Sequence, residues 1–269
     1  MATHSSADVL DALRESIRRI EGAQQRDDRR PLSSGCPPLD RLLPTAGFWP
    51  GILIEWLAEA EGSGAETLAM LAAREAITRG GTFVVLDREG RFYPPAAAAL
   101  GIDLERTIVV RARRLQDELW ALDQALRSRS VAVACVSLER LDWRWFRRLQ
   151  LAVEQGGGLG FLLRPANVRG QPTWSQVQLL VQPQPSPGPR RLRIEITRCQ
   201  GAALGRAVEL EIHEVTGEVR ARKPQEANVA SLSLSSLPAC GVRGRHETLP
   251  VHLAAQLAHP TPRRRSARA

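Results

Sequence analysis

The segment Gly62-Ser63-Gly64-Ala65-Glu66-Thr67 has the glycines of a phosphate-binding loop but lacks the lysine that such a loop carries. A working loop wraps backbone N–H groups around phosphates, places its lysine on the β- and γ-phosphates and holds Mg²⁺ through a hydroxyl. Here Ala65 stands at the lysine position, Glu66 at the first hydroxyl position and Glu59 at the position of the loop's first glycine. The segment therefore keeps the turn and has lost its chemistry.

No neighbour in the sequence replaces the missing positive charge. The only lysine is Lys223, and no basic residue lies between Arg41 and Arg74. One unit-charge pair 4 Å apart is worth about 4 kcal/mol at an effective dielectric constant of 20, so exchanging attraction for repulsion should end tight nucleotide binding. We expect no cofactor and no metal, and interpret the turn as a vestige that starts the next helix (Gly62, Ser63, Gly64 and Thr67). The alternative is a loop that still binds nucleotide or a small anion on its N–H groups.

Composition indicates one full-sized globular core with extensions. The chain has 269 residues, of which 43 % are hydrophobic and 25 % charged. No apolar stretch approaches the roughly 18 residues of a membrane span, and the first residues show no signal peptide. The four cysteines are scattered without paired spacing, which favours free thiols in reducing cytosol over zinc or disulfides. We therefore expect a cytoplasmic protein without a membrane partner.

The net charge of +8 is concentrated near the C-terminus. Residues 220–269 carry nine basic and two acidic side chains, or +7, and the preceding 219 residues carry 37 − 9 = 28 basic and 29 − 2 = 27 acidic side chains, or +1. The densest run is Arg263-Arg264-Arg265. The tail is thus a candidate for weak DNA contact, whereas a basic groove across the whole body is not indicated.

Strand-like and helix-like segments alternate along the middle of the chain. Expected strands lie at 52–57, 83–86, 107–110, 131–136 and 159–163, and helices at 67–78, 94–100, 115–126 and 143–153. This order predicts an α/β fold with a mainly parallel sheet flanked by helices. Segments 177–181, 192–197 and 207–213 follow without helices and predict closing antiparallel strands, with 182–190 as a loop.

Three regions follow from this pattern. Residues 1–30 comprise an N-terminal helix, expected at 7–23, and a polar linker. Residues 31–217 form the core, and residues 218–269 a disordered, basic tail. The N-terminal helix has an apolar stripe that could pack on a neighbouring protomer or back onto its own core, and the sequence does not distinguish these arrangements.

From about Leu32 to Val215 the chain resembles the RecA-like ATPase core, and more closely the ImuA family of accessory proteins of bacterial error-prone translesion synthesis. The resemblance rests on the order and spacing of several segments: Ser33-Ser34-Gly35 with Leu39-Asp40, Gly51-Ile52-Leu53-Ile54-Glu55, Thr82 to Glu89, Leu100-Gly101-Ile102-Asp103, and the closing pair Arg191 to Arg198 and Ala207 to His213. It covers about two thirds of the chain and implies a RecA-like fold.

Several positions depart from the RecA pattern. By resemblance, Glu89 stands at the position of the catalytic glutamate, but a carboxylate there is useless as a base without a positioned γ-phosphate. Ser137 replaces an aspartate that holds Mg²⁺, and Arg164 replaces a glutamine that senses the γ-phosphate. The two DNA-binding loops are also shortened. We therefore expect no hydrolysis and no RecA-like filament, with Glu89 a vestigial catalytic candidate.

An aromatic and basic cluster lies near the start of the 143–153 helix. It contains Trp143, Trp145, Arg147 and Arg148 and is a candidate for contacting a protein partner or stacking single-stranded bases. The simpler interpretation is ordinary helix packing, with Phe146, Leu149 and Val153 inward and the arginines in water. For Asp87 and Glu89, the simpler interpretation is solvated carboxylates paired with nearby arginines.

The resemblance implies a non-hydrolysing adaptor of a translesion (mutasome) complex in the DNA damage or SOS response. Its implied partners are ImuB and the error-prone C-family DNA polymerase, and the tail would dock ImuB, DNA or RecA itself. One alternative is a DNA-dependent ATPase or recombinase with an unorthodox site, which alone would require ATP and Mg²⁺. Another alternative is a damage-induced cell-division inhibitor, which no residue in the sequence supports.

Overall fold

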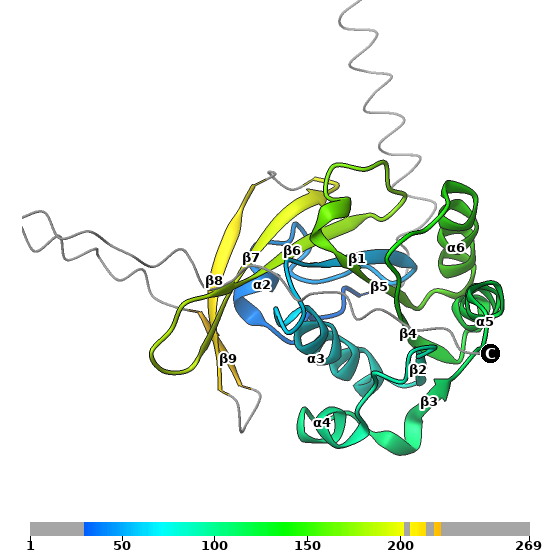
Figure 1. Cartoon of the computed structure of the whole chain (residues 1–269), viewed down its shortest axis with the longest axis horizontal. Helices are drawn as coiled ribbons and strands as arrows, with labels where there is room; N and C mark the ends of the chain where they lie inside the picture. Colours follow the sequence, from blue (N-terminus) through cyan, green and yellow to red (C-terminus); the bar gives the residue numbers. More distant parts are fainter. Residues whose placement is uncertain (1–29, 202–204, 214–217, 222–269) are drawn as a thin grey trace, which may run out of the picture. The chain divides into compact units, whose positions relative to one another are not determined.

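A nine-stranded sheet organises the described part of the chain, in the order β3-β2-β4-β5-β1-β6-β7-β8-β9 (Figure 1). The computed structural model describes residues 30–201, 205–213 and 218–221. The strands are β1 (Ile52–Ala58), β2 (Thr82–Leu86), β3 (Thr107–Val110), β4 (Val131–Ser137), β5 (Leu159–Pro165), β6 (Val177–Gln184), β7 (Arg190–Cys199), β8 (Ala207–Ile212) and β9 (Val219–Ala221). The expected N-terminal helix at 7–23 lies outside the described residues.

The sheet is parallel on one side and antiparallel on the other. Strands β3, β2, β4, β5, β1 and β6 pair in parallel, and β6, β7, β8 and β9 pair antiparallel. Helices join the parallel strands because such strands need a crossover connection. The predicted mainly parallel sheet with closing antiparallel strands is therefore confirmed.

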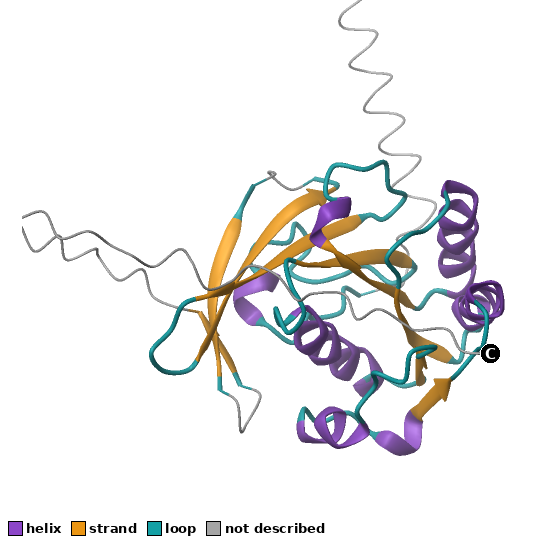
Figure 2. Cartoon of the chain, viewed as in Figure 1, coloured by secondary structure: helices purple, strands orange, loops and turns teal. Residues whose placement is uncertain are grey.

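Helices cover both faces of the parallel part (Figure 2). One face carries α3 (Ala65–Thr78), with α2 (Pro37–Asp40) and α4 (Pro94–Ala99) nearby, over the larger core cluster. The other face carries α5 (Leu115–Arg127) and α6 (Trp143–Gly156) over a second cluster. Two short 3-10 helices complete the list, η1 (Leu104–Arg106) and η2 (Ala166–Val168).

The central strand β1 has both edges paired, with β5 and β6, and both faces buried under helices. Leu53 packs into the α5–α6 cluster, and Ile54 and Trp56 pack into the α3 cluster. The Trp56 ring makes edge contacts with Phe48 and Phe161, at centroid distances of 6.1 and 5.9 Å. The end of this apolar strand fixes where the glycine turn begins.

The antiparallel hairpin extends further than the sequence predicts. Residues 182–190 were expected to be a loop, but β6 continues to Gln184 and pairs Pro183 with Leu192. Beyond Val181 strand β6 no longer pairs with β1, so the missing N–H of Pro183 leaves no ladder bond unmade. The sheet also runs past residue 217, because Val219–Ala221 forms β9 on the free edge of β8.

Candidate functional site

The glycine turn lies between β1 and α3, directly before the start of the helix, as the sequence predicts. Gly64 precedes the first helical residue, Ala65, and has a left-handed φ of 97°. A Cβ atom there would lie 2.5 Å from Cδ1 of Leu192 on β7. Glycine is therefore required at this position both by conformation and by space.

The lysine position is occupied by a buried methyl group. Ala65 is buried at the start of α3, Glu66 beside it is exposed, and Glu59 accepts a hydrogen bond from Nε2 of Gln182 at 2.9 Å. A helix N-terminus carries partial positive charge and favours anions. The negative charges of these carboxylates weaken that attraction for a phosphate.

Two arginines from distant parts of the sequence reach the turn, which reasoning from sequence neighbours missed. Arg190 donates from Nη2 to the carbonyl oxygen of Gly62, and Nη1 of Arg91 lies 3.3 Å from a carboxylate oxygen of Glu61. Both guanidinium groups are thus engaged by acceptors of the turn itself. The β6–β7 hairpin brings Arg190 to the glycine turn, and the chain reversal after β2 brings Arg91 there. No local sequence signal predicts either contact.

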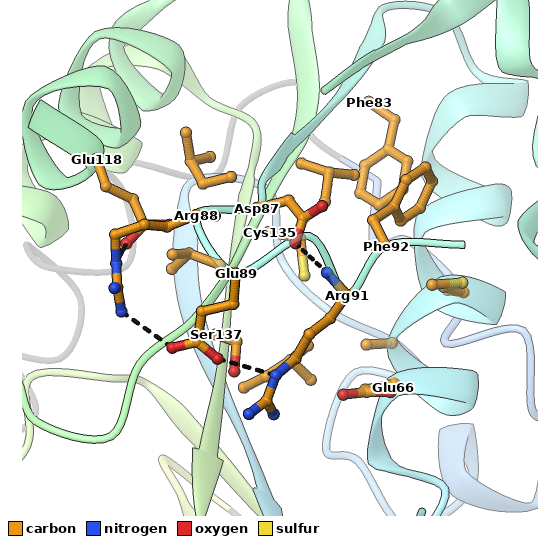
Figure 3. A pocket seen from close by; sticks show the side chains of 16 residues that line it. Glu66, Phe83, Asp87, Arg88, Glu89, Arg91, Phe92, Glu118, Cys135 and Ser137 are labelled. Atoms are coloured by element: carbon orange, nitrogen blue, oxygen red, sulfur yellow. Dashed lines mark hydrogen bonds and ion pairs between the residues drawn. The ribbon is translucent and has the colours of Figure 1, made fainter. Parts of the chain in front are cut away.

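A pocket lies beside α3 at the carboxyl ends of β2, β4 and β5 (Figure 3). In α/β sheets, ligands bind in the crevice at this end of the strands. The cavity volume is about 70 Å³, room for a handful of waters or a small head group at roughly 10–15 Å³ per water. Its polar lining consists of Glu66, Asp87, Arg88, Glu89, Arg91, Glu118 and Ser137, and its apolar lining includes Met70, Phe83, Phe92 and Leu163.

Asp87 and Glu89 lie together in this pocket but in different environments. Asp87 is only 6 % exposed, so the expectation of a solvated carboxylate is wrong for this residue. Its Oδ1 accepts the backbone N–H of Arg91 at 2.7 Å, because the chain turns back directly after β2. Glu89 is half-exposed and pairs with Arg88 at 3.0 Å and Arg91 at 2.9 Å, as expected.

Two further side chains that line the pocket, Glu118 and Cys135, are buried. Glu118 is buried and accepts hydrogen bonds from the backbone N–H and Nε of Arg88, which ties the turn after β2 to α5. Burial, and secondarily the charge of Glu66, raises the pKa of the Cys135 thiol to about 12. Cys135 therefore stays protonated near neutral pH and is no thiolate nucleophile.

Arg164, which the family resemblance places at the γ-phosphate sensor position, lies in a buried ion pair. Arg164 donates from Nη1 to Oε1 of Glu55 at 2.7 Å, and both side chains are buried. Oε2 of Glu55 accepts three more hydrogen bonds, from Thr173, Ser175 and Gln178 at 2.8, 2.8 and 2.9 Å. This guanidinium lies under α6, 5.7 Å from the ring centroid of Phe146, and among the described residues it forms no hydrogen bond or ion pair with the glycine turn.

The aromatic and basic cluster of α6 divides into two halves. Trp145 lies under the guanidinium of Arg148, which forms an ion pair with the buried Asp123 of α5 at 3.0 Å. This half joins two helices, as the packing interpretation predicts. Burial alone would raise the pKa of Asp123, but hydrogen bonds from Arg148 and Arg127 outweigh it and hold that pKa below its usual range.

The other half of the cluster faces solvent. Trp143 is 64 % exposed with the Arg144 guanidinium 5.5 Å from its ring centroid, and Arg147 lies 4.8 Å over Trp174, which precedes β6. Leu151 follows one turn after Arg147 and is also exposed. We call Trp143, Arg144, Arg147, Leu151 and Trp174 the α6 surface. The sequence singled out Trp143 and Arg147 but not Trp174.

Some candidates cannot be placed. Arg263, Arg264 and Arg265 lie outside the described residues. Among the helices within the described ranges, none has the length and apolar character needed to cross a bilayer. Within the same ranges, no group of three or more His, Cys, Asp or Glu side chains is arranged to hold a metal ion.

Comparison with known proteins gives relatives that match this architecture. The RecA N-terminal domain family model matches residues 12–139. RecA of Lactobacillus delbrueckii subsp. bulgaricus is 31 % identical over 103 residues, which cover 38 % of this chain and 31 % of that protein. A crystal structure of the RadB recombinase superposes with a TM-score of 0.58 at 18 % identity, covering 71 % of this chain and all of that one. At that identity the superposition shows the fold alone.

A longer match comes from a different relative. Protein ImuA of Caulobacter vibrioides is 31 % identical over 196 residues, and the match covers 65 % of this chain and 80 % of that protein. The aligned length extends well beyond that shared with RecA of Lactobacillus delbrueckii. The chain therefore belongs to the ImuA family and carries a RecA-like core.

Proposed function

We propose that this protein is a non-hydrolysing RecA-like adaptor of a translesion DNA synthesis complex, acting in the cytoplasm through protein partners after DNA damage. One observation supports this above others: the lysine position of the phosphate loop is a buried alanine, Ala65, followed by a carboxylate. Without that cation the site lacks the charge that holds a triphosphate and stabilises its transfer.

The arginines around the turn support the same proposal. Arg190 is engaged by the carbonyl of Gly62, and Arg91 by Glu61 and Glu89. Arg164 is engaged by the buried Glu55. An incoming phosphate would have to break one of these pairings while facing Glu66 at the helix end. A RecA-like fold whose phosphate loop lacks a free cation can still present surfaces to other proteins, and this is the role that we propose.

The α6 surface is the described region best suited to such contact. Tryptophan and arginine are enriched among residues that dominate the energy of protein interfaces. Arg144 and Arg147 lie against tryptophan rings, so part of the cost of ordering these side chains is already met. By family resemblance the partners are ImuB and the error-prone C-family polymerase, with RecA and DNA as further contacts of the basic tail.

Calorimetry with a non-hydrolysable ATP analogue, with and without Mg²⁺, tests the first part of the proposal. We expect no saturable binding to the wild-type protein. The variant Ala65→Lys with Glu66→Thr restores the loop's cation and hydroxyl and should recover weak binding. Firm binding to the wild type would contradict the loss of nucleotide binding. DNA-stimulated phosphate release that Glu89→Gln abolishes would establish an ATPase.

Pull-down of purified ImuB tests the adaptor role. We expect Trp143→Ala with Trp174→Ala to weaken capture by about tenfold, because each exposed ring contributes contact area. Trp120→Ala, an exposed tryptophan on α5, is the matched control. Full capture by both the α6-surface variant and a chain ending at residue 221 contradicts the proposed contacts.

A further inference from the structure

The lining of the pocket beside α3 has a net negative charge, whereas a phosphate site has a positive one. Its lining carries four carboxylates against two guanidinium groups, with apolar walls from Met70, Phe83 and Phe92. Glu118 is satisfied by Arg88, and Glu89 by Arg88 and Arg91. The other two carboxylates line the same cavity: Asp87 has one long ion pair, with Arg111 at 3.6 Å, and Glu66 has none within the described residues.

Asp87 has an oxygen that receives no hydrogen bond. Its Oδ1 accepts from the N–H of Arg91, but the buried Oδ2 has no donor. Nε of Arg111 forms an ion pair with Oδ2 at 3.6 Å, which is too long for a hydrogen bond, and the Arg111 side chain is mostly exposed. Buried carboxylate oxygens are normally satisfied because leaving one without a donor costs free energy. Figure 3 shows Asp87 with Phe92 and Cys135 among the side chains that line the pocket.

Glu66 supplies a second negative charge toward this space. It lies on the first turn of α3, and no ion pair is formed by it within the described residues. Glu66 and Cys135 both line the pocket, and the charge of Glu66 contributes to raising the pKa of the buried Cys135 thiol. A donor-bearing cation between Asp87 and Glu66 would satisfy one carboxylate by hydrogen bonding and the other by charge.

We propose that this pocket binds an arginine side chain of a protein partner, whereas other proteins with this fold bind a nucleotide. This inference rests on the adaptor function proposed above. The guanidinium donates to Oδ2 of Asp87 and lies against Phe92, while its aliphatic stem packs along Met70. Guanidinium groups suit such sites because they are planar, weakly hydrated and rich in donors. The small cavity volume fits a side-chain head group.

Small-molecule probes test the chemistry of the pocket directly. Titration of the full-length protein with n-butylguanidinium, followed by NMR, should give saturable binding, and its neutral isostere n-butylurea should bind about tenfold more weakly or not at all. Methylguanidinium should bind more weakly than n-butylguanidinium because it lacks the stem. Asp87→Asn and Glu66→Gln should each weaken n-butylguanidinium binding, with Asp117→Asn, an exposed carboxylate that does not line the pocket, as the unchanged control.

The outcomes separate cleanly. Equal affinity for the guanidinium and the urea, or unchanged affinity in both Asp87→Asn and Glu66→Gln, overturns the proposal. Displacement of the guanidinium by Mg²⁺ alone also overturns it, because the pocket would then be a site for an inorganic cation. Glu66 is exposed at the pocket mouth, so Glu66→Gln remains informative if Asp87→Asn destabilises the fold.

Capture of the partner identified in the pull-down above completes the test. Loss of capture in Asp87→Asn and Glu66→Gln, but not in Asp117→Asn, supports an arginine of that partner as the occupant. Unchanged capture overturns the pocket proposal and leaves the adaptor function standing. Binding of the ATP analogue by the wild type overturns the adaptor function whatever the guanidinium probes show.

Discussion

At the scale of single residues, Gly64 is where conformation and packing constrain the chain most tightly. Its φ of 97° disfavours any side chain, and a Cβ would meet Leu192 at 2.5 Å. We predict that Gly64→Ala lowers the free energy of unfolding by about 2–3 kcal/mol, from left-handed strain and from the displaced leucine. Urea denaturation measures the loss as a shift in midpoint at constant slope.

Gly62 provides the matched control for this prediction. It also has a positive φ, 69°, but a Cβ there meets nothing within 4 Å. Gly62→Ala should therefore cost about 1 kcal/mol, the conformational part alone. Equal losses in the two variants would show that contact between the turn and β7 contributes nothing.

The buried pair Glu55–Arg164 gives a second prediction at this scale. Arg164→Ala leaves Glu55 buried without its cation, and we expect a loss of about 3–5 kcal/mol in the free energy of unfolding. Arg169 forms an ion pair of similar length with Glu195, 2.6 Å, but its side chain is half-exposed. Arg169→Ala should cost about 1 kcal/mol or less, and similar losses for the two arginines would contradict the assigned role of burial.

The glycine turn could be predicted from sequence, but its surroundings could not. The positions of Gly62, Gly64, Ala65 and Glu66 along the chain specify a phosphate loop without its cation. The contact of Arg190 with this turn depends on how the β6–β7 hairpin folds back, which is a property of tertiary structure. Likewise Asp87 has the sequence context of a strand end, and only the return of the chain at Arg91 buries it.

At the scale of elements, hydrophobic periodicity was sufficient for the parallel strands and their helices. Strand β3, Thr107–Val110, has the bounds that its short apolar run predicts. The length of the β6–β7 hairpin was underestimated because Pro183 is typical of a loop. At Pro183 strand β6 pairs only with β7, so a proline is tolerated there. Strand β9 carried no pattern of its own and is ordered by pairing with β8.

The contact between α5 and α6 gives a prediction for pH. Burial would raise the pKa of Asp123, but hydrogen bonds from Arg148 and Arg127 hold it below its usual range. A pKa that is lower in the folded than in the unfolded state stabilises the fold above the unfolded value, about 3.9 for aspartate. This contribution is lost as pH falls below about 4, through the lower pKa of the folded state.

Urea denaturation between pH 3 and 7 measures this dependence. The wild type should lose stability on acidification more steeply than Asp123→Asn, in which no carboxylate titrates at that position. Asp117→Asn removes an exposed carboxylate from the first turn of the same helix, which is worth about 0.3–1 kcal/mol, and should keep most of the wild-type dependence on pH. Parallel curves for the wild type and Asp123→Asn would show that the two arginines do not stabilise the ionised form.

At the scale of the whole molecule, charge is divided unevenly between the core and the remainder of the chain. Residues 222–269 carry eight basic and two acidic side chains, so removing them lowers the net charge from +8 to 8 − 6 = +2. Affinity that arises from phosphate contacts falls linearly with the logarithm of salt concentration, with a slope of about −0.9 per phosphate neutralised on duplex DNA. A chain ending at residue 221 should therefore retain little DNA affinity.

Fluorescence anisotropy with a labelled duplex, across a series of salt concentrations, measures this effect. We expect weak, sequence-independent binding by the full chain, with a slope that becomes close to zero on truncation because the remaining residues carry a net charge of only +2. Replacing Arg263, Arg264 and Arg265 together by glutamine should reduce the slope by about three phosphate contacts while leaving the core unchanged. A truncated chain that binds with the full-length slope would place the phosphate contacts on the core, where Arg144 and Arg147 of the α6 surface would be the first residues to replace.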